Sequence, residues 1–347
     1  MIDRYDYDMP FMLRYENVAW YEDGLVRILD RRIYPKETHF VICKTYKEVA
    51  QAISDMVTQS AGPYTACGMG MALAAYEART LSKEEKIRFL EKAASTLSNA
   101  RPTTANRMGK VTSSALEVAK KAIKEGKDVD KEIFLSTIAS LNRRYRLMDK
   151  VAENLTSMIK DGDKVLTQCF GETIIGTMGR MLKKQGKDVR FFCAETGPYL
   201  QGARLTATCL KEMGFDTTVI ADNMIAFALE KFAIDLFTSA ADTITCDGHV
   251  ANKVGTFQIA ILAKHFGIPY FVTGVVDSDK KTRADIKIEY RDPKLVLGDY
   301  TYKGVKSIYP SFDITLPDLI DKIVTEKGIF DPYKLDEYLK IEGERFY

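Results

Sequence analysis

Long apolar runs, histidine and paired cysteine are what this chain lacks. Its 347 residues include only 3 His and 6 Cys, and neither type forms a CxxC pair or a cluster at metal-ligand spacing. No apolar stretch approaches the roughly 18 residues that a membrane-spanning helix needs. These absences predict reduced thiols, no structural zinc or other metal, and no membrane segment.

An excess of one charge is also missing. The 50 Lys and Arg against 48 Asp and Glu leave a net charge of +2, and the two signs alternate along stretches such as 82–93. A basic surface for nucleic acid is therefore not indicated. The first 20 residues carry acids and aromatics where a signal peptide needs a basic start and an apolar core, which predicts a cytoplasmic protein.

Hydrophobic periodicity divides the chain into two parts. A short strand pattern over 25–35 is followed by apolar spacings of three and four residues, which indicate helices. From Asp161 onward, short β-branched or aromatic runs alternate with helical segments, and this alternation is typical of a parallel sheet with crossover helices. We predict an α/β protein with a β start and helical domain over 1–155 and a second domain over 156–347. The helices are expected over 45–57, 70–78, 83–97, 104–123 and 130–159, and residues 278–294 are expected to form a polar loop or arm.

The ends of the predicted strands carry polar residues. Cys169, Glu195, Asp222 and Asp242 each follow one of the apolar runs. Ligands of an open parallel sheet bind beyond the carboxyl ends of its strands, so these four residues are candidates for a site. An acid in such a turn also commonly caps the next helix, and that reading stays open for each of them.

Cys169 is the candidate nucleophile or acid/base group. A thiol near a helix N-terminus is favoured as thiolate, whereas Glu172 nearby opposes this. A lone cysteine is more often inert packing, and we expect that role for the other five, Cys43, Cys67, Cys193, Cys209 and Cys246.

Phosphate-binding motifs are weak when taken singly. The GxG of residues 67–75 follows no strand and lacks the rest of a dinucleotide fingerprint, so helix packing explains it better. Asn252 and Lys253 are expected to open a helix after a glycine, and Arg101 precedes a helix that begins at Pro102. Both positions suit an anion, although capping explains each of them equally well.

Longer stretches resemble one family. "RPTTANRM", "ETGPYLQGARLTATCLKEMG", "ADNMIAFAL" and "AADTITCDGHVANKVGTFQIAILAKHFGIPYFV" are similar to the methylthioribose-1-phosphate isomerase family, from about Asp30 to Gly328. Its relatives include ribose-1,5-bisphosphate isomerase, 5-deoxyribose-1-phosphate isomerase and regulatory subunits of the initiation factor two-B complex. The resemblance implies a helical N-terminal domain, a Rossmann-like C-terminal domain, a homodimer and no metal or nucleotide cofactor.

The family's catalytic pair is a cysteine after the first Rossmann strand and an aspartate in a "GAD" stretch, which match Cys169 and Asp242. An aldose 1-phosphate has its anomeric oxygen blocked, so an acid must open the ring. We expect Asp242 to be that acid, kept protonated by an apolar surround. Cys169 would then move a proton from C2 to C1 through a cis-enediolate, with a direct hydride shift as the competing mechanism.

The resemblance also implies binding residues. The phosphate-loop positions match Gln59, Ser60 and Ala61, and the remaining substrate-binding positions match Arg101, Gln201, Asn252 and Lys253. Arginine and lysine would hold the phosphate, and Gln201 would bond a sugar hydroxyl.

The departures from the family lie around the same site. The loop that usually reads "VRGAPAIG" has Gln59 for its arginine and Ser60 for its glycine. Gly197 replaces the arginine of "ETRP", and Phe170 replaces an asparagine. Loss of a bidentate arginine weakens or relocates phosphate binding, so altered substrate preference is the expected result.

Three functions follow from these residues. The first is an aldose–ketose isomerase for a pentose 1-phosphate with a 5-methylthio or 5-deoxy group, for which Phe170, Tyr64 and Tyr199 offer an apolar wall or merely core packing. The second is a non-catalytic regulatory protein that binds a sugar phosphate or nucleotide, favoured by Gln59 and Gly197. An isomerase for ribose 1,5-bisphosphate is less favoured, because the loop has lost basic charge. The third function, an isomerase for a sugar without phosphate, is also less favoured, because Arg101 and Lys253 are kept.

Overall fold

The computed structural model describes residues 4–101, 105–299 and 301–344. Two compact units divide between Arg146 and Leu147, inside one long helix. The boundary predicted between residues 155 and 156 falls in the same helix and stays a prediction. No helix within the described residues is long and apolar enough to cross a membrane.

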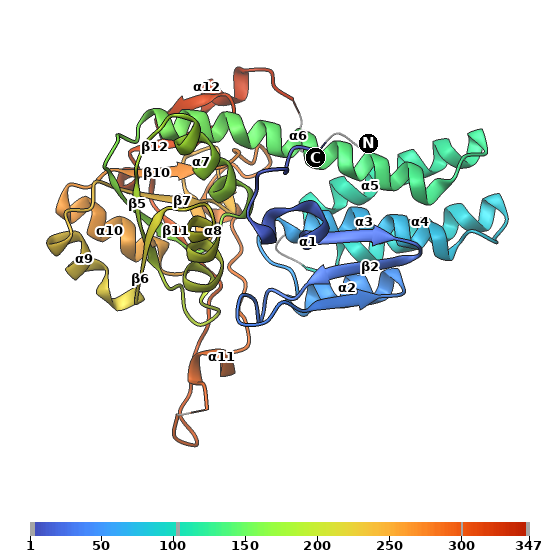
Figure 1. Cartoon of the computed structure of the whole chain (residues 1–347), viewed down its shortest axis with the longest axis horizontal. Coiled ribbons are helices and arrows are strands. Elements are labelled where there is room, and N and C mark those ends of the chain that lie inside the picture. The colour runs from blue at the N-terminus through green and yellow to red at the C-terminus, as the bar shows by residue number, and fades with distance from the viewer. Residues whose placement is uncertain (1–3, 102–104, 300, 345–347) are drawn as a thin grey trace. The chain divides into compact units, whose positions relative to one another are not determined.

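The N-terminal unit is mostly helical, as predicted, and also contains a small antiparallel sheet in the order β1-β2-β3 (Figure 1). The strand expected over 25–35 ends at Leu29, because the carboxylate of Asp30 accepts the backbone N–H of Arg32 at 3.0 Å and closes a turn. The elements are α1 Tyr15–Val18, β1 Ala19–Glu22, β2 Leu25–Leu29, β3 Phe40–Cys43, α2 Tyr46–Ser54, α3 Gly62–Glu77, α4 Lys83–Ser98, α5 Ala105–Glu125 and α6 Val129–Ser157.

Helix α3 begins eight residues before the stretch predicted for it. Nearly all of its residues are buried, so the helix shows no polar face from which its start can be recognised. Its glycines allow close packing, since a Cβ at Gly68 would lie 2.6 Å from the Thr137 side chain. The GxG stretch is therefore a packed helix, and the expected helix start at Pro102 lies outside the described residues.

The C-terminal unit is built on a seven-stranded, mostly parallel sheet in the order β13-β12-β10-β7-β4-β5-β6. Helices α7 and α8 cover one face and α9 and α10 the other, which confirms the predicted α/β fold (Figure 1). The five runs predicted as strands form β4, β5, β6, β7 and β10. The parts are β4 Lys164–Gln168, α7 Glu172–Lys184, β5 Arg190–Ala194, α8 Ala207–Glu212, β6 Asp216–Ile220, α9 Ile225–Lys231, β7 Leu236–Ala240, α10 Thr256–Phe266, β10 Tyr270–Thr273, β12 Lys322–Thr325, β13 Gly328–Phe330 and α12 Leu335–Lys340.

A second, antiparallel sheet in the order β11-β9-β8 lies beside the carboxyl ends of the parallel strands. The prediction that Asn252 and Lys253 open a helix is wrong, because both lie in β9, where they pair with Asp313 and Phe312 of β11. Helix α10 begins only after Gly255, whose φ of 102° turns the chain and is readily adopted only by glycine. The strands are β8 Thr243–Ile244, β9 Val250–Lys253 and β11 Phe312–Thr315.

The stretch expected to be a loop or arm is largely irregular. Residues 278–299 and 301–310 contain only a short 3-10 turn at Arg283–Asp285, the four-residue helix α11, Lys294–Leu297, and an isolated bridge between Tyr290 and Pro310. The segment projects from the C-terminal unit in Figure 1 and returns to the sheet at β11.

Candidate active site

The sheet order brings Cys169 and Asp242 to neighbouring strand ends. Strands β4 and β7 are parallel partners with Gln168 opposite Ser239, and the two candidate residues follow these strands. The chain winds from β4 toward β6 on one side and from β7 toward β12 on the other. The two residues therefore flank the topological switch point, where ligands of such sheets bind.

The turn at Cys169 is held by two threonines. Cys169 has a φ of 59°, its N–H donates to Thr196 Oγ1 at 3.0 Å, and its carbonyl accepts from Thr206 Oγ1 at 2.5 Å. These bonds, from the elements that follow β5, fix a left-handed conformation that a non-glycine residue seldom adopts. Cys169 lies just before α7 and is half-buried, so its backbone is fixed while part of the residue stays exposed.

Four of the other cysteines are fully buried, as expected of packing residues. Burial raises the pKa of the Cys43 thiol to about 11 and that of Cys193 to about 12, and it also raises the pKa of Cys67. Such thiols stay protonated and unreactive at neutral pH. Cys246 is half-buried, with its sulfur 3.8 Å from the carbonyl oxygen of Asp277.

Asp222 has a structural role that its position alone did not reveal. Its two carboxylate oxygens accept the backbone N–H groups of Thr196 and Gly197 at 2.9 and 2.7 Å. The carboxylate thereby holds the turn after β5, the turn whose Thr196 hydroxyl supports Cys169. This role is neither the site group nor the helix cap that the sequence left open for Asp222.

Asp242 is exposed in the described structure. Its backbone N–H donates to the carbonyl of Ala251 in β9 at 2.9 Å, which fixes where the chain leaves β7. The apolar surround expected around its carboxyl is therefore wrong for this structure. The reason is topological: Asp242 lies in the connection between β7 and β8, outside the core.

Gln201 is buried beside the end of β5. Its side chain is 4% exposed, and its Oε1 has no hydrogen-bond partner among the described residues. A Cβ at the next residue, Gly202, would lie 1.8 Å from the carbonyl oxygen of Ala194, so only glycine lets the π-helical turn Gly202–Thr206 approach β5 this closely. The turn thus presents a buried amide oxygen that suits a ligand hydroxyl.

Asn252 and Lys253 lie in β9 and are both buried. Asn252 Nδ2 donates to Thr256 Oγ1 at 3.1 Å, in the first turn of α10. The Lys253 ammonium lies 5.3 Å from the ring centroid of Phe312 and 5.9 Å from that of Tyr309. Aromatic faces at such distances stabilise an ammonium group.

Tyr309 is a candidate residue that sequence reasoning missed. Its side chain is 3% exposed, and its hydroxyl has no hydrogen-bond partner among the described residues. Burial raises the pKa of this hydroxyl, and the charge of a thiolate at Cys169 raises it further. The ring lies 6.1 Å from that of Tyr199. Tyr309 is thus a neutral hydrogen-bond donor close to Cys169 and Lys253, marked in the sequence only by an aromatic before Pro310.

A cavity of about 680 Å³ opens on the same edge, between α10, the last residue of β4 and the turns after β5 and β6. Gln168, Gly197, Asp222, Gln258 and Asp313 supply its polar lining, whereas Cys169 and Asp242 do not line it. The Asp313 carboxylate accepts the N–H groups of Gly255 and Phe257 at 2.6 and 3.1 Å. Burial raises the pKa of Asp313 to about 6, despite these bonds.

The titration of Asp313 predicts a pH-dependent stability. Its pKa is above the usual 3.8 in the folded chain, so the folded state binds this proton more tightly than the unfolded state. The stabilisation is full below about pH 4 and is lost as the pH rises through 6, by up to about 3 kcal/mol. Urea unfolding between pH 4 and 7 should show a smaller fall in Asp313→Asn than in the wild type. Equal falls in the two proteins would contradict this, and exposed Asp318→Asn is the control.

The predicted binding residues of the N-terminal unit gather at one end of its helices. Gln59, Ser60 and Ala61 form the loop before α3, and Arg101 follows α4. The ends of the two helices are close, since Cys67 Sγ lies 3.7 Å from the carbonyl oxygen of Leu97.

The Gln59 side chain of this loop is buried, whereas Ser60 and Ala61 are partly exposed. Gln59 is 2% exposed, its Nε2 lies 3.4 Å from the carbonyl oxygen of Met56, and its own carbonyl accepts from the Arg31 guanidinium at 2.9 Å. Arg101 is 7% exposed, and its Nε and Nη1 have no partner among the described residues. Two buried cations therefore lie at this end, Arg101 and Arg31, and Arg31 is bonded to the loop backbone, while the loop itself carries no charge.

Within the part of the chain that the structure describes, no group of three His, Cys, Asp or Glu side chains could hold a metal ion. The fold and the strand-end residues define the class: a doubly wound α/β unit preceded by a helical unit, with a cysteine and an aspartate at the switch point. The chain belongs to the initiation factor 2 subunit family, whose model matches residues 64–332. This confirms the resemblance found in the sequence.

The relatives cover nearly the whole chain. It is 34% identical to methylthioribose-1-phosphate isomerase 1 of Pseudothermotoga lettingae, over 94% of this chain and 98% of that protein. It is 35% identical to 5-deoxyribose 1-phosphate isomerase of Clostridium botulinum, over 88% of this chain and 93% of that protein. The crystal structure of 5-methylthioribose 1-phosphate isomerase from Pyrococcus horikoshii matches with a TM-score of 0.81 at 27% identity, over 95% of this chain and 99% of that one.

Proposed function

We propose that this chain is an aldose–ketose isomerase that converts a pentose 1-phosphate carrying a 5-methylthio or 5-deoxy group into the ribulose 1-phosphate. The observation that carries the proposal is that Cys169 and Asp242 follow the neighbouring parallel strands β4 and β7. Relatives named for both activities, similar over most of the chain, support it. The six cysteines, all free thiols, favour a cytoplasmic location.

Ring opening is the first chemical task. The phosphate blocks the anomeric oxygen, so the ring oxygen must accept a proton before its bond to C1 can break. Asp242 is the proposed donor, and bound substrate would exclude water from its exposed carboxyl and favour the protonated form. The carboxylate that remains can accept the proton that the C2 hydroxyl later loses, which returns Asp242 to its starting state.

Hydrogen transfer is the second task. The Cys169 thiolate would take the proton from C2 and return it to C1 through a cis-enediolate, so that no proton is gained or lost overall. The rigid turn around Cys169, pinned by Thr196 and Thr206, supports such a positioned group. Lys253 and the Tyr309 hydroxyl are cationic and neutral donors near the same residue, suited to the negative charge of the intermediate.

Substrate binding needs a cation for the phosphate and polar groups for the sugar hydroxyls. We propose that Lys253 and Arg101 are the cations for the phosphate and that Gln201 and Asn252 bond sugar hydroxyls. The buried amide of Gln59 adds no charge, and Ser60 and Ala61 can offer only backbone and hydroxyl groups. A substrate with a single phosphate therefore fits better than ribose 1,5-bisphosphate. The homodimer that the family resemblance implies belongs to the same proposal, and sedimentation of the purified chain tests it.

Relative rates test this preference. The purified protein is given 5-methylthioribose 1-phosphate, 5-deoxyribose 1-phosphate, ribose 1-phosphate and ribose 1,5-bisphosphate, and kcat/KM is measured for each. We expect the first two to exceed the bisphosphate by at least about tenfold, the effect of one unmatched charged contact. A faster reaction with the bisphosphate would contradict the proposed substrate class.

Tyr309→Phe should lower kcat about tenfold and leave KM within about twofold. The reason is that one neutral hydrogen bond to charge developing in the transition state is worth about 1.4 kcal/mol. Steady-state kinetics on the preferred substrate measures both constants. Tyr290→Phe removes a hydroxyl from an exposed residue of the arm and is the matched control. A kcat equal to that of the wild type would remove Tyr309 from the mechanism.

The uncharged loop also favours a second function, that of a regulatory protein without turnover. Gln59 and Gly197 stand where the resembling isomerases carry arginine, and the family description names initiation factor subunits. Binding of a sugar phosphate without formation of ketose would favour this function.

A further inference from the structure

Arg144, on α6, is a buried cation that forms no ion pair with a carboxylate among the described residues. Its side chain is 5% exposed, its Nη2 lies 3.4 Å from Thr65 Oγ1, and its Nε has no hydrogen-bond partner among the described residues. The ring centroid of Tyr145 lies 5.8 Å from the guanidinium carbon, which gives at most a weak cation–π contact. Burial of an unpaired guanidinium is costly, so an anion at this position would be strongly favoured.

The nearby acid is already engaged elsewhere. This acid is Asp6: its charge raises the pKa of the Tyr15 hydroxyl, and the charge of Arg144 lowers the same pKa. Asp6, however, forms an ion pair with Arg4 at 2.6 Å and accepts the backbone N–H of Tyr15 at 2.6 Å. Its carboxylate is therefore committed, and Arg144 needs a counter-charge of its own.

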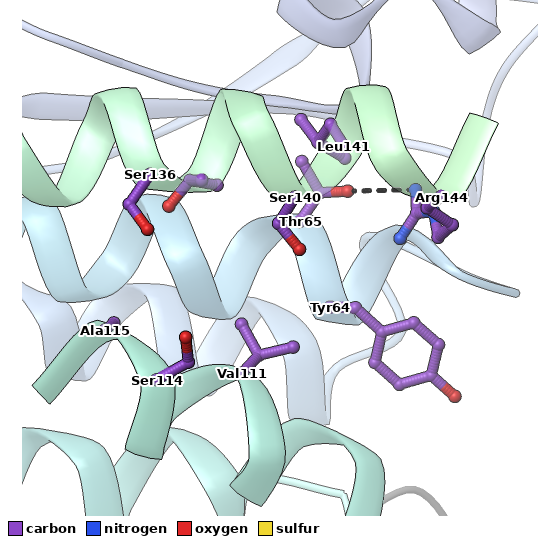
Figure 2. Close-up of a pocket in the computed structure, with 10 residues that line it drawn as sticks. Tyr64, Thr65, Val111, Ser114, Ala115, Ser136, Ser140, Leu141 and Arg144 are labelled. Carbon is purple, nitrogen blue, oxygen red and sulfur yellow. Dashed lines mark hydrogen bonds between the residues drawn. The ribbon is translucent and has the colours of Figure 1, made fainter. Parts of the chain in front are cut away.

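A small cavity adjoins the Arg144 side chain, between α3, α5 and α6. Figure 2 shows Arg144 reaching Thr65 of α3 at one end of this cavity, with Ser136 and Ser140 on α6 and Ser114 on α5. Ser136, Ser140 and Arg144 are spaced by four residues and so share one face of α6. Arg144 is the one charged side chain among the described residues that line the cavity, so hydroxyl donors and a cation meet there without an acid.

The start of α3 adds to the positive character of the cavity. Tyr64 and Thr65 lie in the first turn of this 16-residue helix, and that turn contains no acidic residue. The N-terminus of a helix carries a partial positive charge. A guanidinium beside it is repelled, whereas an anion beside it is attracted. The volume of about 30 Å³ exceeds what one water molecule needs, and it leaves room for a small ion.

We propose that this cavity is a binding site for a small inorganic anion, phosphate or chloride, held by the guanidinium of Arg144 and the hydroxyls of Thr65 and Ser140. The anion neutralises Arg144 and joins α6 to the start of α3. Because the loop with Gln59, Ser60 and Ala61 runs directly into α3, the anion also stabilises that loop. The site lies wholly within the N-terminal unit and does not depend on the isomerase activity.

Thermal unfolding of the full chain tests the site. Samples at one ionic strength contain increasing phosphate or increasing chloride, with gluconate making up the balance. The wild type should show a Tm that rises and saturates with one of the two anions, as expected of a specific site. The saturating anion identifies the ligand. A rise that does not saturate and is equal in all variants reflects general salt effects and would overturn the proposal.

Variants locate the anion. Arg144→Met should weaken the apparent affinity at least tenfold, and Arg144→Lys, which keeps the charge, should recover part of it. Ser140→Ala and Thr65→Val each remove one hydroxyl and should weaken binding severalfold, which keeps the test open if Arg144→Met does not fold. Lys184→Met alters an exposed cation of the C-terminal unit, on α7, and should keep the wild-type response. Wild-type anion dependence in Ser140→Ala and Thr65→Val, or its loss in Lys184→Met, would overturn the assignment.

Discussion

Cys169→Ser is expected to lower the isomerase kcat by about a thousandfold, with an unchanged fold. Acid/base groups placed beside reacting carbons contribute about 10²–10⁴ in rate, and a serine hydroxyl is a far weaker base than a thiolate at neutral pH. The turn should survive the exchange, because its hydrogen bonds use the backbone N–H and carbonyl of residue 169. Ketose formation followed by NMR measures the loss.

Cys246→Ser is the matched control for that variant. Cys246 is also half-buried and in the C-terminal unit, but it lies beyond β8 with its sulfur near the carbonyl of Asp277. We expect its kcat to stay within about twofold of the wild type. Retention of more than about a tenth of the wild-type rate in Cys169→Ser would exclude this thiol as the group that moves the proton.

Asp242→Asn is expected to lower kcat about a thousandfold while substrate binding persists. An amide cannot donate a proton to the ring oxygen, so the ring stays closed. The residue is exposed, and the exchange leaves its backbone N–H, which donates to Ala251, unchanged, so the variant should fold normally. The rise in Tm with added substrate reports binding, and NMR reports turnover.

The exposed acid Asp318→Asn serves as the control for a generic charge effect. Near-normal turnover in Asp242→Asn would show that another group opens the ring. Loss of both turnover and substrate-induced stabilisation would instead mean that Asp242 mainly binds substrate. Either outcome would contradict the proposed role of this carboxyl.

The C-terminal sheet could be predicted because its strands are short, apolar and separated by amphipathic helices. All five predicted runs are strands, and the edge that they define carries Cys169 and Asp242. The start of α3 could not be found, because a helix buried on all sides has no polar period. Asn252 and Lys253 were assigned to a helix, since nothing local in "VANK" indicates pairing with the distant strand β11.

The site was predicted less completely than the fold. Tyr309 comes near Cys169 only through the return of the irregular arm, so its local sequence gives no sign of its position. Arg144 lies in a helix with charges of both signs, a pattern that is typical of an exposed helix, but its side chain is buried. The stretch "NRRYR" around it contains no acid that could pair with it. The expectation of an apolar surround for Asp242 was wrong. It was based on the need of the mechanism for a protonated acid and not on the sequence around the residue.

The most direct test of the account is ketose formation from 5-methylthioribose 1-phosphate, followed by NMR in the wild type, Cys169→Ser and Asp242→Asn. The account predicts turnover by the wild type and almost none in either variant, with all three proteins folded. Absence of turnover by the folded wild type with this sugar, 5-deoxyribose 1-phosphate, ribose 1-phosphate and ribose 1,5-bisphosphate would contradict it. So would undiminished turnover in both variants.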